Sequence, residues 1–223
     1  MISAKNIKKI KRPKIIDGFK VPVWWECGWR RKNCKKRSCV LCGGIITDRE
    51  KHIAKGENPD SMKSVLEDVG QSLGDALAMV KADLEKRGID ITNIEDIKKP
   101  PESQSYPLYR KIYKWRNGII KLIDKANETN EVWISTEPAA DLLWYIYTLS
   151  AKTYRQLCNR WHIKNGDGYG EFDYKYTQYV LGEVLDILEN SLVQLTKLNS
   201  QQQVVLMFAL NQLNKLKKPI LSI

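Results

Sequence analysis

The sequence has few histidines, and this shortage excludes several kinds of catalytic site. It contains two histidines, His52 and His162, and no nucleophile-elbow pattern, so a serine or cysteine catalytic triad has no support. Neither histidine has a glutamate three residues before it, which argues against the Glu-x-x-His pattern of di-iron helical bundles. The sequence therefore favours a protein without catalytic activity.

Long hydrophobic segments are also absent. The longest uncharged and mainly apolar run covers residues 142–151, which is about half the length that a transmembrane helix requires. The first twenty residues are rich in lysine but lack the apolar stretch of a secretory signal. Because 43% of the residues are hydrophobic and 28% are charged, the chain can build a globular core. We therefore expect a soluble, cytoplasmic protein with no membrane partner.

Acidic residues are scarce in the first fifth of the chain, so the net positive charge of the protein is concentrated there. Residues 1–42 contain thirteen Lys and Arg but only two acidic residues, whereas the rest of the chain holds 24 of each sign. The whole net charge of +11 thus lies in one short segment. A localised cationic surface favours a polyanion as partner, and nucleic acid is the commonest. The alternatives are a lysine-rich tail that aids solubility and, with less support, an anionic membrane surface.

Four of the five cysteines are clustered at the N-terminal end of the chain. Cys27, Cys34, Cys39 and Cys42 follow the spacing C-x6-C-x4-C-x2-C. Disulfides are disfavoured in a reducing compartment, whereas four convergent thiolates suit a tetrahedral metal site. The two-residue spacer before Cys42 lets two sulfurs reach one ion, and Gly43 and Gly44 follow it. The sequence therefore predicts a four-cysteine metal site, to which the fifth cysteine, Cys158, does not contribute.

The spacing leaves the identity of the metal open. Both Zn²⁺ and iron–sulfur clusters use sets of four cysteines, and the spacing of bacterial ferredoxins is absent. We expect Zn²⁺, with an iron–sulfur cluster as the alternative. Six cations lie between the first and third cysteine, where some of them offset the charge of the thiolates.

The candidate nucleic-acid contacts are cations and tryptophans near these cysteines. They are Lys11, Arg12, Lys14, Trp24, Trp29, Arg30, Arg31, Lys32, Lys35, Lys36 and Arg37. The cations suit phosphate, and the tryptophans suit stacking on bases or sugars. Docking of the tryptophans onto the rest of the protein explains them equally well.

Apolar residues at helical spacing predict an all-α body of about five helices. A capping-box pattern at residues 47–50 predicts a short helix over about 48–55, and Gly56 stops it. Longer helices are expected from about 60 to 88, over 106–127 and over 138–163, with two more around residues 180–195 and 206–216. The predicted domains are a basic four-cysteine module, residues 1–46, and a helical bundle, residues 47–223.

Together these features predict a metal-binding protein whose N-terminal module contacts nucleic acid while the bundle acts as a scaffold or binds a protein partner. One alternative is an iron–sulfur protein in electron transfer, redox sensing or an oxidoreductase complex. Another is a module that binds only proteins.

Overall fold

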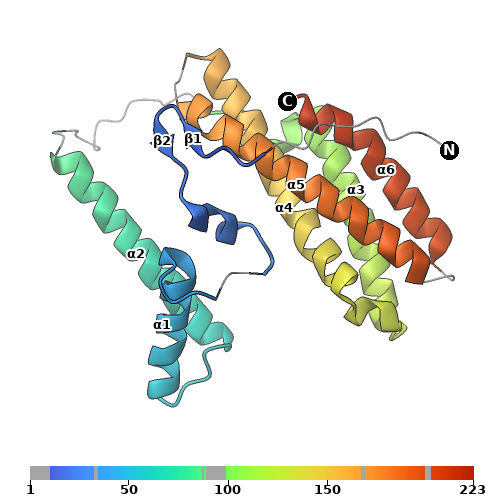
Figure 1. Ribbon diagram of the computed structural model, residues 1–223, viewed down its shortest axis with the longest axis horizontal. Coiled ribbons are helices and arrows are strands. Elements are labelled where there is room, and N and C mark those ends of the chain that lie inside the picture. The colour runs from blue at the N-terminus through green and yellow to red at the C-terminus, as the bar shows by residue number, and fades with distance from the viewer. Residues whose placement is uncertain (1–10, 33–34, 87, 89–98, 167–168, 199–201) are drawn as a thin grey trace. The chain divides into compact units, whose positions relative to one another are not determined.

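The computed structural model describes residues 11–32, 35–86, 88, 99–166, 169–198 and 202–223. These residues are mostly helical (Figure 1), consistent with the predicted all-α bundle. The chain divides into two compact units. The first, which we call the bundle unit, comprises residues 1–22 and 100–223, and the second, the cysteine unit, comprises residues 23–99.

Four long helices make up most of the described part of the bundle unit. They are α3 (Pro107–Glu128), α4 (Glu137–Lys164), α5 (Tyr169–Leu198) and α6 (Gln203–Leu221). Helix α5 packs along both α4 and α6, while α3 contacts α4 and α6, so the four run alongside one another (Figure 1). The short 3-10 turns η3 (Ser103–Ser105) and η4 (Val132–Ser135) precede α3 and α4.

The core of this unit is the apolar stripe of α5. Its leucines at positions 181, 185, 188, 192 and 195 are almost fully buried, as the helical spacing requires. The helices predicted over 106–127 and 138–163 are confirmed, and each begins with a proline in its first turn, where the missing N–H costs no hydrogen bond. Pro219 lies inside α6 near its end.

One carboxylate in this core is buried and accepts hydrogen bonds from three neighbouring side chains. Asp173, in the second turn of α5, accepts hydrogen bonds from Asn159 and Arg155 of α4 and from Thr177 one turn further along α5. Burial alone would raise the pKa of Asp173, but these hydrogen bonds outweigh it and hold the pKa below its ordinary value. The network therefore joins α4 to α5 through a charged side chain.

A small hairpin precedes the helices. Strand β1 (Ile15–Ile16) pairs antiparallel with β2 (Phe19–Lys20), with Ile15 opposite Lys20. The turn residues Asp17 and Gly18 both have positive φ, as a two-residue hairpin turn requires. The hairpin belongs to the bundle unit, where β1 contacts α5 and Ile16 is buried.

The cysteine unit contains the 3-10 turn η1 (Val23–Gly28), α1 (Val40–Ala54) and α2 (Met62–Lys86). The predicted long helix is confirmed as α2. The predicted start of the short helix is wrong, because α1 begins eight residues before position 48. Thr47 does not cap a helix; its hydroxyl donates to the Gly43 carbonyl inside α1. The predicted domain boundary, between residues 46 and 47, also lies within α1.

Candidate metal centre

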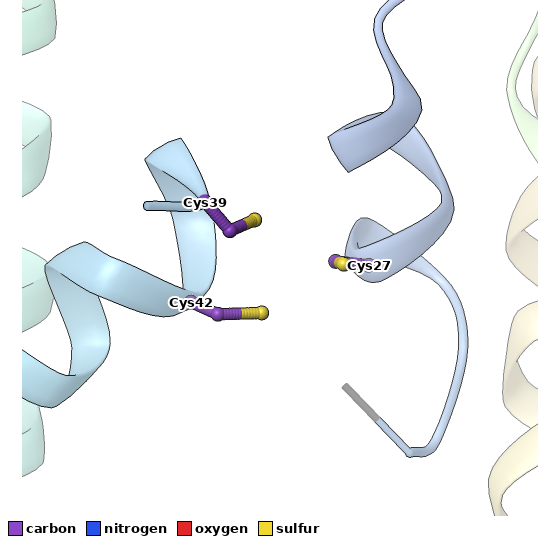
Figure 2. Close-up of side chains that lie close together, drawn as sticks. All are labelled: Cys27, Cys39 and Cys42. Atoms are coloured by element: carbon purple, nitrogen blue, oxygen red, sulfur yellow. The ribbon is translucent and has the colours of Figure 1, made fainter. Parts of the chain in front are cut away.

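Three cysteine sulfurs of the cysteine unit converge on one point. Cys27 lies on η1, Cys39 immediately precedes α1, and Cys42 lies in the first turn of α1. Their three Sγ atoms all lie within 4.8 Å of one another. Figure 2 shows the side chains of Cys39 and Cys42 extending from α1 toward Cys27. We call this group the three-cysteine cluster.

The sequence placed a fourth ligand, Cys34, in the same site. Residue 34 lies outside the described residues, so its part in the site stays a prediction. The described cysteines form no disulfide. Cys158 lies on α4 of the bundle unit, where burial raises the pKa of its thiol, and it is not among the clustered sulfurs.

The helix start explains how two sulfurs come to face the same way. Cys39 is the N-cap of α1, with extended backbone (φ −80°, ψ 128°), and its side chain makes no capping hydrogen bond. Cys42 follows three residues later, about one turn along the helix. The first N–H groups of a helix lack partners within it, and the helix dipole is positive at this end. The start of α1 therefore suits negatively charged sulfur ligands.

Gly43 lets the chain before α1 fold back onto the helix. A Cβ atom at position 43 would lie 2.2 Å from the carbonyl oxygen of Arg37, a distance that no side chain can occupy. The Gly43 N–H donates to the Cys39 carbonyl at 2.7 Å. At Gly44 a Cβ atom would meet nothing within 4 Å. Of the two glycines that follow Cys42, Gly43 is the one that the local packing requires.

Residues 30–37, which we call the basic segment, contain the six cations that lie between Cys27 and Cys39 in the sequence. Arg30 pairs with Glu26 at 2.9 Å and lies over the Trp29 ring, and Arg37 pairs with Glu50 of α1. Lys35 and Lys36 are exposed to solvent. These two lysines are therefore better placed for an external phosphate than the two arginines.

The predicted nucleic-acid contacts fall in both compact units. Lys11, Arg12 and Lys14 belong to the bundle unit, whereas Trp24, Trp29 and the basic segment belong to the cysteine unit. The two tryptophans differ in environment, since Trp24 is 39% exposed and Trp29 is 3% exposed. Only Trp24 presents a substantial surface to a ligand.

A second polar cluster, which sequence reasoning missed, joins α1 to α2. The buried imidazole of His52 lies with Nδ1 2.6 Å from a Glu57 carboxylate oxygen and Nε2 3.0 Å from one of Asp68. The chain separates His52 from Asp68 by sixteen residues, so no helical or strand period links them. Only the packing of the two helices brings them together.

This cluster predicts a pH dependence of the contact between α1 and α2. The hydrogen bond to Glu57, followed by that to Asp68, raises the pKa of His52, and the same bond to His52 lowers the pKa of Glu57. Because the pKa of His52 is higher in the folded protein, protonation of His52 stabilises the fold. This stabilisation is fully present below the pKa of the unfolded chain, about 6.5, and is lost as the pH rises through the folded pKa.

We expect the His52 ring to titrate above about 6.5 in an NMR titration, with His52→Gln used to assign its signal. Urea unfolding midpoints should fall more between about pH 6 and about pH 9 in the wild-type protein than in His52→Gln. A ring that titrates at or below the ordinary value would contradict the charged pairing.

Comparisons with protein-family models, with curated proteins and with solved structures give no match. In the described part of the chain, none of the helices has the length and hydrophobicity needed to cross a membrane.

Proposed function

We propose that this protein is a metal-binding, nucleic-acid-binding or accessory protein. In this proposal Cys27, Cys39 and Cys42, with Cys34 as fourth ligand, hold one Zn²⁺ ion, and the basic segment contacts the phosphate backbone. The observation that carries the proposal is the convergence of three Sγ atoms within 4.8 Å of one another, from two segments that flank the basic segment.

The sulfur spacing favours a single ion. With Zn–S bonds of about 2.3 Å, two sulfurs of a tetrahedral site lie about 3.8 Å apart. In a four-iron cluster each cysteine binds a different iron, which spreads the sulfurs more widely. Sulfurs within 4.8 Å thus support Zn²⁺ over a cluster of that type. An iron–sulfur centre is the alternative outcome of the metal test.

Charge supports the phosphate contact. Residues 23–46 contain six Lys and Arg and one acidic residue. A zinc ion with four thiolates carries a charge of about −2, so this segment keeps a net charge of about +3. A metal ion with four cysteine ligands has no open coordination position for chemistry. A closed metal site beside a cationic surface therefore favours binding over catalysis.

The metal test uses the full chain, purified without oxygen. Replacing Cys27, Cys39 or Cys42 with serine should remove most of the bound metal, whereas Cys158→Ser should retain it. Elemental analysis identifies the ion, and the wild-type protein should be colourless. Visible absorption together with stoichiometric iron would support the iron–sulfur alternative instead of zinc. Equal loss of metal in all four variants would refute the assignment of the ligands.

The binding test follows the affinity of the metal-loaded protein for short DNA and RNA probes as salt increases. Each phosphate contact should contribute about −0.9 to the slope of log affinity against log salt concentration on duplex DNA, or about −0.7 on single strands. Replacing both Lys35 and Lys36 with alanine should make this slope less steep by the contribution of up to about two phosphate contacts. Lys81 and Lys86, exposed lysines of α2, provide the matched control pair. Absence of salt-dependent binding to either the DNA or the RNA probe would favour a module that binds only proteins.

A further inference from the structure

A cavity of about 400 Å³ lies beside the three-cysteine cluster, within the cysteine unit. Its walls include Trp24, Arg30, Lys32 and Lys36, together with Cys27 and Cys39 of the cluster. Ligand pockets of proteins commonly measure about 300–1,000 Å³, so this volume is sufficient for a small planar group. The cavity combines an aromatic ring and cations with two of the candidate metal ligands.

Trp24 is the aromatic wall of this cavity. Its ring meets that of Trp25 edge-on, with ring centroids 6.5 Å apart, and this packing restricts its orientation. Even so, Trp24 remains 39% exposed. A large apolar ring that is held in place but left open to solvent is a suitable platform for stacking.

Three cations, Arg30, Lys32 and Lys36, line the same cavity as the Trp24 ring. Glu26 and the face of Trp29 fix the Arg30 guanidinium, so Arg30 helps to build the wall. Lys32 and Lys36 are exposed residues of the same wall. Lysine ammonium groups on flexible stems can follow a phosphate beside a stacked base.

We propose that this cavity binds an unstacked base of a single-stranded nucleic acid, with the base on Trp24 and its phosphate near Lys32 and Lys36. The inference rests on the proposed function and specifies the partner. A base within a duplex is already stacked on both faces and offers only its edges in the grooves. A single strand can turn a base outward, so the tryptophan ring discriminates between the two forms.

The test compares Trp24→Ala with the wild-type protein, both as full chains loaded with metal. Fluorescence anisotropy measures binding to a labelled thymidine oligonucleotide and to a duplex of the same length. We expect Trp24→Ala to weaken single-strand binding by about 5- to 150-fold and to leave the salt slope and the duplex affinity unchanged. Trp24→Phe, which keeps an aromatic face, should restore most of the affinity. Trp144→Ala, at another exposed tryptophan of the chain, is the matched control.

Each result decides the inference. Salt-dependent binding that Trp24→Ala leaves unchanged, or weakens equally for both probes, overturns it while the proposed function stands. Loss of metal in both Trp24 variants assigns the ring to the metal site and also overturns it. Absence of salt-dependent binding to either probe by the wild-type protein overturns the proposed function as well.

Discussion

Replacing Gly43 with alanine should weaken metal binding by the three-cysteine cluster by about 100-fold. This is the upper end of the loss of metal affinity that follows when residues supporting the metal ligands are mutated. The new Cβ atom would lie 2.2 Å from the Arg37 carbonyl oxygen. Because that oxygen belongs to the backbone, no side-chain rotation can relieve the clash. Either the chain before Cys39 moves away or the first turn of α1 unwinds, and both changes displace candidate ligand sulfurs.

Gly44→Ala provides the matched control for this prediction. The same methyl group at position 44 meets nothing within 4 Å. Alanine is favoured over glycine inside a helix by about 1 kcal/mol, so Gly44→Ala should keep its metal and stabilise α1 slightly. Competition with a chromophoric chelator measures both affinities. Equal metal affinity of the two variants would show that the approach of Arg37 does not position the cluster.

The second large effect is expected in the bundle unit. Replacing Asp173 with alanine should lower the free energy of unfolding by about 2–4 kcal/mol. The reason is that the buried side chains of Asn159 and Thr177 would each lose an acceptor. The half-exposed side chain of Arg155 can turn to water instead, which moderates the loss. Urea unfolding followed by circular dichroism measures the change.

Asp17→Asn is the control for the second experiment, because asparagine also tolerates the positive φ of residue 17. Asp17 also pairs with a cation of α5, Lys175, at 3.4 Å, but both side chains are exposed. Exposed pairs contribute about 0–1 kcal/mol, so this variant should unfold almost as the wild-type protein does. Asp173→Asn keeps one acceptor oxygen and should fall between the two. An Asp173→Ala variant as stable as Asp17→Asn would mean that the buried network adds nothing to stability.

The sequence predicted the long helices well because helical periodicity is a local property. The apolar repeat and the flanking proline or glycine signals suffice for α2, α3 and α4, whose limits agree with the expectations to within about two residues. The clustering of Cys27, Cys39 and Cys42 in the chain likewise predicted three sulfurs that the fold brings together. The hairpin was missed although its Asp17–Gly18 turn is a local signal, because its strands are only two residues long.

The tertiary structure decided what depends on partners distant in the chain. The N-cap of α1 is Cys39, which is not one of the usual capping residues, and the chain before it folds back onto Gly43. Similar residues also acquired different roles: Trp29 is buried while Trp24 is open, and Arg37 pairs with Glu50 while Lys36 faces solvent. Composition and spacing determine which residues can form a helix or bind a metal. Burial and ion pairing depend on contacts across the fold, so only the three-dimensional packing distinguishes structural side chains from those available to a ligand.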